Sequence, residues 1–287
     1  MTIDLDGPDD VVVHGDNGLV LPSLPDASFQ LIYIDPPFNT GKTQTRRTLS
    51  TARDDDGDRV GFKGHTYSTK VTASRAYADT FDDYLAYLEP KLQEARRLLA
   101  PSGTFYLHLD AREVHYVKVM LDGIFGRDCF LNEIIWAYDY GARATKKWPA
   151  KHDTILVYVK SADDYWFDAS AVDREPYMAP GLVTKEKAER GKLPTDVWWH
   201  TIVSPTGREK TGYPTQKPEG LLRRMIAAST KPGDWVLDFF AGSGTTGAVA
   251  RALGRRFLLV DQNPEAIAVM RTRLGNERVA YLTTARF

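Results

Sequence analysis

Residues 235–247 have the sequence WVLDFFAGSGTTG, in which a short apolar run leads into a glycine-rich segment. Apolar runs that end in glycine turns are typical of buried parallel strands, and such sheets bind ligands at the carboxyl ends of their strands. Gly242, Gly244 and Gly247 match the spacing G-x-G-x-x-G, and we expect a helix over residues 245–253. The stretch therefore predicts one strand, turn and helix of a doubly wound α/β sheet.

The next predicted strand, residues 257–260 (FLLV), ends in Asp261. In nucleotide-binding folds the glycines let the backbone approach the cofactor, and an acid after the following strand binds the ribose hydroxyls. This layout suits an adenosine-containing cofactor, and alone it fits NAD as well as S-adenosylmethionine. Asp238 favours S-adenosylmethionine, because its carboxylate would repel a pyrophosphate but could hold a methionine ammonium group, directly or through water.

Another apolar run, residues 29–34 (FQLIYI), leads directly into Asp35-Pro36-Pro37-Phe38. A carboxylate and a backbone carbonyl here could each accept one N–H of an exocyclic amine and so turn its lone pair toward a methyl donor. Consecutive prolines fix φ and remove two donors, which leaves the carbonyls rigid. Phe38 offers a face on which an extruded base could stack. Alone, the tetrapeptide also suits a turn that merely ends a strand.

The segment between these motifs continues the α/β pattern. Apolar residues at helical spacing over residues 81–99 predict an amphipathic helix of about five turns, with Thr80 as its N-cap. Pro90 predicts a kink or a break into two helices. A strand is expected over residues 104–109, followed by a helix that carries Val114, Val117, Leu121 and Phe125.

Three regions depart from the α/β pattern. Residues 42–75 are polar and indicate a long loop, and residues 276–287 indicate a short tail. Residues 161–212 mix aromatic, proline and basic residues without a period, which indicates an inserted lobe. The predicted domains are residues 1–160 and 213–287, the two halves of one core, and the lobe over residues 161–212.

The bulk composition narrows the classes of protein. Of the 287 residues, 43% are hydrophobic, and no apolar run is long enough for a membrane span. The first ten residues are acidic rather than signal-like, so we expect a cytoplasmic protein. The single cysteine, Cys129, excludes an intrachain disulfide framework. His108, His115, His152 and His200 have no metal-ligand spacing, and no metal site is predicted.

The net charge of −1 is not that of a typical nucleic-acid binder, but a DNA enzyme needs a basic face and not a basic average. Each basic cluster taken alone also suits a solvated surface. The candidate DNA-binding residues are Arg46, Arg47, Arg143, Lys146, Lys147, Arg208 and Lys210.

Taken together, these motifs resemble the amino-methyltransferases of restriction-modification systems, in the beta-class order of catalytic motif, recognition region and cofactor motif. The similar stretches cover most of the chain outside residues 42–75 and the lobe. They are LIYIDPPFNTGK (31–42), YLEPKLQEARRLLAPSGTFYLHLD (87–110), NEIIWAY (132–138), KHDTILVYVKS (151–161) and TGYPTQKPEGLLRRMIAASTKPGDWVLDFFAGSGTTG (211–247).

The resemblance implies a role for each matching residue. Asp35, Pro36 and Pro37 would face the target amine, and Phe38 would stack on the flipped base. Residues 161–212 would recognise the target, with Trp198-Trp199-His200 packing them against the core. The residues implied to hold the cofactor, S-adenosylmethionine, are Asp16, Asn17, Asp35, Lys217, Asp238, Phe239, Phe240, Ala241, Gly242, Ser243, Gly244, Thr245, Thr246 and Asp261.

The function that this resemblance implies is methyl transfer to N6 of a flipped adenine in duplex DNA. The candidate partners besides DNA are a second copy of the chain and a cognate restriction endonuclease. An N4-cytosine enzyme is the main alternative, although that group more often has Ser than Asp at the position of Asp35. An RNA methyltransferase fits the recognition lobe less well. A nicotinamide-dependent oxidoreductase or a nucleotide-binding non-enzyme would leave Asp35-Pro36-Pro37-Phe38 without a role.

Methylation at carbon 5 of cytosine is disfavoured, because it would require a Pro-Cys nucleophile and Cys129 follows Asp128.

Overall fold

The computed structural model describes residues 3–40, 42–53, 59–60, 66–79, 81–141 and 143–284, and for residues 42–79 it describes the backbone only. The chain divides into two units. The first unit comprises Met1–Pro36 and Leu85–Phe287, and the second is Pro37–Tyr84.

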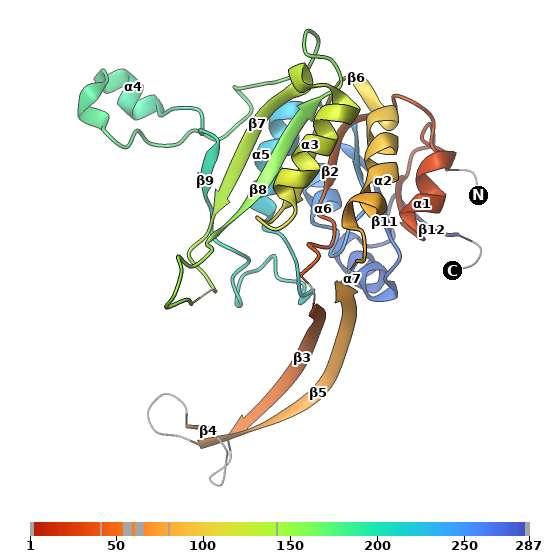
Figure 1. Ribbon diagram of the computed structural model, residues 1–287, viewed down its shortest axis with the longest axis vertical. Helices are drawn as coiled ribbons and strands as arrows, with labels where there is room; N and C mark the ends of the chain where they lie inside the picture. Colours follow the sequence, from red (N-terminus) through yellow and green to blue (C-terminus); the bar gives the residue numbers. More distant parts are fainter. Residues whose placement is uncertain are drawn as a thin grey trace. The chain divides into compact units, whose positions relative to one another are not determined.

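A mixed sheet organises the first unit (Figure 1). In the described residues nine strands form it, in the order β12-β1-β11-β10-β2-β6-β8-β7-β9. The strands from β12 to β6 are parallel to one another, β8 is antiparallel to β6 and to β7, and β9 is parallel to β7. The predicted doubly wound, mostly parallel α/β sheet is confirmed. The strands are β1 Asp10–His14, β2 Phe29–Ile34, β6 Leu99–Leu109, β7 Phe130–Ala137, β8 His152–Val159, β9 Val197–Trp199, β10 Trp235–Asp238, β11 Arg256–Asp261 and β12 Val279–Thr283.

Helices cover both faces of this sheet, with α2 and α3 over one face and α5 and α6 over the other (Figure 1). Strand β2 has apolar side chains on both faces of the sheet, and helices on both faces bury them. Its Leu31 and Tyr33 belong to the buried cluster that includes the apolar side chains of α5, α6 and α7, while Ile32 and Ile34 are also fully buried. The helices are α1 Asn17–Val20, α2 Tyr84–Leu98, α3 Val114–Phe125, α4 Lys185–Arg190, α5 Glu219–Ser229, α6 Thr245–Ala252 and α7 Pro264–Leu274, with 3-10 turns η1 Leu21–Ser23, η3 Arg127–Cys129 and η4 Pro180–Leu182.

The second unit corrects the prediction of a long loop over residues 42–75. Strands β3 Lys42–Arg53, β5 Thr66–Asp79 and β4 Arg59–Val60 form a three-stranded sheet in the order β3-β5-β4. β3 and β5 are antiparallel, with Lys42 opposite Asp79 and Arg53 opposite Tyr67. Threonine is frequent in both strands, and β-branched residues favour extended backbone even where no apolar period marks a strand.

Three further predictions about local structure are wrong in detail. The predicted break at Pro90 is absent, because Leu88, Leu92 and Ala95 on either side of it are fully buried and packing holds α2 together, while the alternative of a kink stays a prediction. β6 begins at Leu99, before the predicted residue 104. The expected tail contains β12, which pairs in parallel with β1. The predicted N-cap, Thr80, lies outside the described residues.

The predicted lobe over residues 161–212 is grouped with the core in the first unit. Its segment Val197–Trp199 is β9 and joins the main sheet beside β7. Trp198 is buried, whereas Trp199 is 76% exposed, so one tryptophan of the predicted pair packs against the core and the other does not. The lobe also contains α4, which lies away from the sheet at the end of an extended segment (Figure 1). In the described part of the chain, no helix has the length and apolarity needed to cross a membrane.

The face covered by α3 yields a stability prediction. Phe105 of β6 is fully buried and stacks on Phe125 of α3, with ring centroids 5.4 Å apart and planes 7° apart. We expect Phe105→Ala to lower the free energy of unfolding by about 3–5 kcal/mol, because it removes apolar contacts and leaves a cavity. Urea unfolding of the wild type and the variant measures the change in the free energy of unfolding. Tyr116→Ala, at a 65% exposed position on α3, is the control, with an expected change below about 0.5 kcal/mol. Equal losses in the two variants would contradict the assignment of this core.

Candidate active site

Four neighbouring strands deliver the predicted site residues to one edge of the sheet. In the sheet β1, β11, β10 and β2 are adjacent and parallel, so their carboxyl ends lie side by side. β1 is followed by Asp16 and Asn17, β11 ends in Asp261, β10 leads into residues 239–244, and β2 leads into Asp35. The chain changes direction across the sheet between β10 and β2, which is where doubly wound sheets bind their ligands.

The glycine-rich turn after β10 requires its glycines. Gly242 and Gly244 have φ of +50° and +72°, a region that side-chain-bearing residues rarely adopt. A Cβ on Gly244 would lie 2.7 Å from Cγ of Met270, and one on Gly242 would lie 3.2 Å from Cε1 of Tyr213. Gly244 is also the N-cap of α6 and provides no side-chain cap. The turn therefore presents backbone N–H groups at the amino end of a helix, which attract a negatively charged ligand group.

Asp238 is buried beneath this turn and holds it in place. Its Oδ1 accepts the N–H of Phe240 at 3.0 Å, and its Oδ2 accepts the hydroxyl of Thr246 at 2.6 Å. Burial raises the pKa of Asp238 to about 7; its two hydrogen bonds oppose the shift, and the charges of Asp35 and Asp261 add to it. Each oxygen already has a partner, so Asp238 shapes the turn, and its predicted contact with the cofactor stays a prediction.

Asp261 also binds the turn. Its Oδ2 accepts the N–H of Gly242 at 2.7 Å, and its Oδ1 accepts the N–H of Asn263 at 2.8 Å. Burial raises its pKa, and these two N–H groups oppose the shift. The backbone carbonyl of Asp261 accepts the N–H of Gly15 at 3.0 Å, which fixes the start of α1. Within the first unit, Asp261 therefore ties the glycine-rich turn to the segment after β1.

The segment after β1 contacts the same turn. Asp16 is the N-cap of α1, and its Oδ1 accepts the N–H of Gly18 at 2.8 Å. The side-chain amide of Asn17 donates to the carbonyl of Phe239 at 2.8 Å. The structure thus brings both predicted residues to the turn.

Asp35 and Lys217 form an ion pair in which Nζ of Lys217 contacts Oδ2 of Asp35. Both side chains are largely buried, at 15% and 14% exposed. Oδ1 of Asp35 is buried and has no hydrogen-bond partner among the described residues. The backbone carbonyl of Lys217 accepts the hydroxyl of Thr245 at 3.2 Å, which links this pair to the glycine-rich turn.

Pro37 and Phe38 begin the second unit. Within it, the hydroxyl of Tyr84 donates to the carbonyl of Pro37 at 2.7 Å, and the N–H of Phe81 donates to the side chain of Asn39 at 3.1 Å. The Pro37 carbonyl therefore has a partner, which leaves the Pro36 carbonyl as the predicted acceptor for the amine. The predicted roles of Pro36 and Phe38 stay predictions.

Sequence reasoning missed a buried polar chain behind Asp35. The hydroxyl of Tyr33 lies 3.0 Å from Nδ1 of His108, whose Nε2 lies 3.3 Å from Oδ2 of Asp153. The hydroxyl of Tyr138 donates to Oδ1 of Asp153 at 3.0 Å. Burial opposes ionisation of Asp153, but the bond and charge of His108 and the charge of Lys217 bring its pKa below the ordinary value. The sequence signal for this chain was the presence of polar side chains, those of Tyr33, His108 and Asp153, inside otherwise apolar strands.

Other missed residues surround the turn. Arg273 donates to the hydroxyl oxygen of Thr245 at 3.0 Å and to Glu219 at 2.6 Å, so it braces the starts of α6 and α5. Tyr87 and Lys91 of α2 lie off its apolar stripe, and Nζ of Lys91 is 3.8 Å from the ring centroid of Tyr87. Burial raises the pKa of Tyr87, with smaller effects from the charges of Asp16 and Asp261. The sequence signal for these two residues was their spacing: an aromatic residue and a lysine lie four residues apart on α2, outside its apolar stripe.

The candidate DNA-binding residues fall into three groups. Arg143, Lys146 and Lys147 are exposed in the loop between β7 and β8. Arg208 and Lys210 are exposed in the loop between β9 and α5. Arg46 and Arg47 lie in β3, and their side chains are outside the described part of the chain. In that part, no group of three or more His, Cys, Asp or Glu is placed to hold a metal ion.

A doubly wound sheet in which Asp35 follows the strand adjacent to a glycine-rich turn is the arrangement expected of an S-adenosylmethionine-dependent methyltransferase. Residues 29–271 match the family model N6_N4_Mtase, described as DNA methylase. Because this match spans far more than half of the chain, the chain belongs to the N6/N4 DNA methylase family.

Curated relatives share most of its length. The chain is 33% identical over 271 residues to the DNA adenine methyltransferase YhdJ of Escherichia coli strain K12, covering 92% of this chain and 82% of that protein. It is 31% identical over 257 residues to the type II methyltransferase M.HpaI of Haemophilus parainfluenzae, covering 90% of this chain and 71% of that protein.

Solved structures share the fold. M1.HpyAVI in complex with S-adenosylmethionine has a TM-score of 0.59 at 20% identity and covers 93% of this chain and 100% of its own. The cytosine-N4-specific PvuII DNA methyltransferase has a TM-score of 0.62 at 17% identity and covers 94% of this chain and 88% of its own. The family assignment supports S-adenosylmethionine as the cofactor, and the two solved structures show that the fold is shared.

The pKa of Asp238 generates a prediction about stability. Between about pH 4 and pH 7 the folded carboxyl keeps a proton that the unfolded carboxyl, with its ordinary pKa of 3.8, has lost. The folded state therefore binds more protons in this window, and the contribution of Asp238 to stability falls as pH rises through it. We expect the free energy of unfolding of Asp238→Asn to fall less between pH 4 and pH 7 than that of the wild type, because asparagine does not titrate.

Urea unfolding of both proteins at intervals from pH 4 to pH 8 measures the difference. Burial also raises the pKa of Asp10, but this residue is present in both proteins, so its contribution cancels in the comparison. The charge of Asp261 acts on Asp238, so the difference between the two profiles includes the coupling of these two carboxyl groups. Parallel stability profiles between pH 4 and pH 7 would show that Asp238 is already ionised in the folded protein.

Proposed function

We propose that this chain transfers a methyl group from S-adenosylmethionine to N6 of an adenine extruded from duplex DNA. The observation that carries the proposal is the position of Asp35. It follows the strand adjacent to the glycine-rich turn, its Oδ2 is held by Lys217, and its Oδ1 is buried without a partner among the described residues. A buried carboxylate oxygen without a hydrogen bond is costly, and an amine N–H would satisfy it.

The residues of the first unit fit the cofactor. Gly242 and Gly244 let the turn adopt a backbone conformation that presents N–H groups at the start of α6, while Tyr213 and Met270 occupy the space that a Cβ would need. Asp238 and Asp261 are buried carboxyl groups with raised pKa values, and a ligand that carries an ammonium and a sulfonium group would favour their ionised forms. We assign the methionine half to residues 238–246 and Lys217, the ribose to Asp261, and the adenine to the segment with Asp16 and Asn17.

When bound, S-adenosylmethionine supplies a methyl group on a positively charged sulfur. Oδ1 of Asp35 accepts one N–H of the target amine, and the carbonyl of Pro36 accepts the other. The nitrogen lone pair would then be free to take the methyl group, which S-adenosylmethionine, held by residues 238–246 and Lys217, would supply while it keeps the electrons of the C–S bond on sulfur. The nitrogen becomes positively charged and loses a proton, for which Asp35 is the adjacent acceptor. Orientation and charge supply the acceleration, because the methyl donor is already reactive.

Residues 161–212 serve in this proposal as the target-recognition region, and the exposed basic loops serve as contacts to phosphate. The irregular backbone of the lobe supports this role, because loops carried on a rigid scaffold commonly make specific contacts. Of the candidate partners, duplex DNA is required by the reaction, and a second copy of the chain and a cognate restriction endonuclease remain proposals. A bacterial DNA substrate would place the protein in the cytoplasm.

The carboxylate of Asp35 provides the first test. We expect Asp35→Ala to abolish transfer of radiolabelled methyl groups to DNA, because the amine loses its acceptor. Calorimetry with S-adenosylmethionine separates this loss from a loss of cofactor binding, and it also tests the nicotinamide alternative if NAD is titrated in parallel. Substantial methyl transfer by Asp35→Ala would falsify the assignment of Asp35 as the acceptor.

The identity of the base needs a separate test, because an adenine and a cytosine amine could donate the same two hydrogen bonds. Asp rather than Ser at residue 35 supports adenine, as does the similarity to a relative named as a DNA adenine methyltransferase. We expect N6-methyladenine when DNA methylated by the protein is digested and its nucleosides are identified by mass spectrometry. N4-methylcytosine alone would overturn the choice of base and leave the fold and cofactor in place. Sequencing of the same DNA with a method sensitive to methylation gives the target site.

A further inference from the structure

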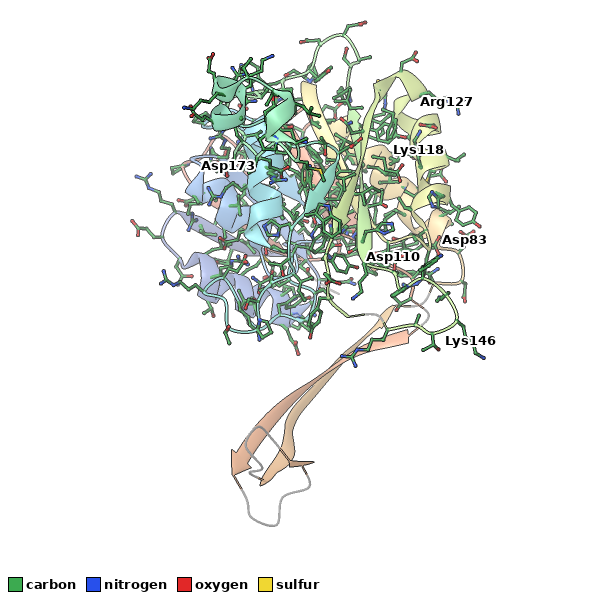
Figure 2. All side chains as sticks on the ribbon, turned by 90° about the vertical axis from the view of Figure 1, so that its left-hand side faces the viewer. Asp83, Asp110, Lys118, Arg127, Lys146 and Asp173 are labelled. Carbon is green, nitrogen blue, oxygen red and sulfur yellow. The ribbon has the colours of Figure 1, made fainter. Side chains whose placement is uncertain are left out.

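The loop between β7 and β8 emerges beside the candidate active site. β2 and β6 are parallel, with Ile34 level with Leu107, and Asp35 directly follows Ile34. β8 is antiparallel to β6 and pairs Thr154 with Leu109, while β7 ends opposite the start of β8 with Ala137 level with His152. The loop over residues 138–151 therefore leaves the sheet at the edge where β2 and β6 end. Figure 2 shows Lys146 at the same end of the first unit as Asp110, and Arg127 toward the opposite end.

The stem of this loop is tied to the buried polar chain behind Asp35. The N–H of Tyr138 donates to the carbonyl of Lys151 at 2.9 Å, which closes the loop. The hydroxyl of Tyr138 donates to Asp153, which in turn contacts His108. Nζ of Lys151 lies 3.5 Å from Oδ1 of Asp139 and 3.5 Å from the carbonyl oxygen of Gly141. The loop is thus anchored at both ends to the strands that surround the site.

The tip of the loop presents an indole to solvent. Trp148 is 94% exposed, whereas Trp136 and Trp198 are buried. Within the described part of the chain Trp148 has no hydrogen bond or ring contact, and Tyr140 of the same loop is 62% exposed. A large aromatic side chain in this state commonly marks a surface that binds a partner.

The charges around Trp148 indicate the chemistry of that partner. Lys146 and Lys147 directly precede it, and Arg143 lies in the same loop, all three exposed. The acid of the loop, Asp139, is paired with Lys151 at the stem, so the tip carries positive charge only. An aromatic ring between cations suits a nucleic acid, whose phosphates pair with the lysines and whose bases stack on the ring.

Resting on the proposed function, we propose that Trp148 enters the base stack of the duplex at the position vacated by the extruded target base. Lys146 and Lys147 contact the phosphates on either side. Extrusion breaks stacking and pairing, and an indole in the gap replaces part of the lost stacking. Trp148 thereby acts as a positioning residue: it holds the duplex in the state that delivers the base to Asp35 and takes no part in the transfer itself.

The test compares two duplexes that carry the target site found by sequencing. In one duplex the target base is paired, and in the other it faces an abasic site, so that little pairing opposes its extrusion. We expect Trp148→Ala to lower the single-turnover methylation rate about ten-fold on the paired duplex, because one stacking contact is lost. On the duplex with the abasic site, the loss should be less than about two-fold. Trp148→Phe should retain most of the activity on both.

Two control variants isolate the role of the ring. Tyr116→Ala removes an aromatic side chain that is 65% exposed and lies on α3, outside the loop over residues 138–151 and outside the predicted recognition lobe. It should behave as wild type on both duplexes. The double variant Lys146→Ala/Lys147→Ala should weaken DNA binding equally on both duplexes and flatten its salt dependence, because phosphate contacts do not sense pairing.

The outcomes separate this proposal from the proposed function. Failure of the wild-type protein to methylate the paired duplex would reject the proposed function. Wild-type activity combined with an equal loss, or no loss, on the two duplexes in Trp148→Ala would reject only the insertion of Trp148. A change of oligomeric state in Trp148→Ala, seen by size-exclusion chromatography, would instead assign the exposed indole to a contact between two copies of the chain.

Discussion

The parallel pairing of β2 with β10 is the constraint on which the site depends. These strands come from opposite ends of the chain, and their register places Leu31 beside Val236 and Ile32 beside Leu237. Because parallel strands end at the same edge, Asp35 and the glycine-rich turn become neighbours. Lys217 then joins them, with its side chain on Asp35 and its backbone carbonyl on Thr245. A shift in this register would separate the predicted acceptor of the amine from the predicted binding site of the methyl donor.

Charge is the second feature of this edge. Asp35, Asp238 and Asp261 are brought together, and burial of carboxylates is unfavourable unless partners compensate. Lys217 pairs with Asp35, while backbone N–H groups and the hydroxyl of Thr246 hold the other two. The edge therefore holds rigid carboxyl groups whose ionised forms a cationic ligand would favour, an arrangement that suits a cationic methyl donor better than a pyrophosphate.

Among the described strands of the nine-stranded sheet only β8 runs against the direction of the others, and this has a consequence for the proposed DNA face. A parallel crossover would have returned the chain to the far edge, whereas the antiparallel pairing of β8 with β6 and β7 opens a loop at the active-site edge. That loop carries Trp148 and its lysines. Its stem is linked through Tyr138, Asp153 and His108 to Tyr33 of β2, the strand that leads into Asp35, so the proposed contact with DNA and this strand share one support.

The sequence by itself determined the two halves of the site, because Asp35-Pro36-Pro37-Phe38 and residues 238–244 are local motifs whose proline and glycine geometry is set by neighbouring residues. It also predicted the parallel core, since buried strands are continuous apolar runs. It did not reveal the hairpin of β3 and β5, whose polar strands lack an apolar period, or the continuity of α2 through Pro90, which depends on packing. Only the tertiary structure decided the pairing of Lys217 with Asp35 and the chain from Tyr33 to Tyr138, because these contacts join residues far apart in sequence, and strand order alone brings them together.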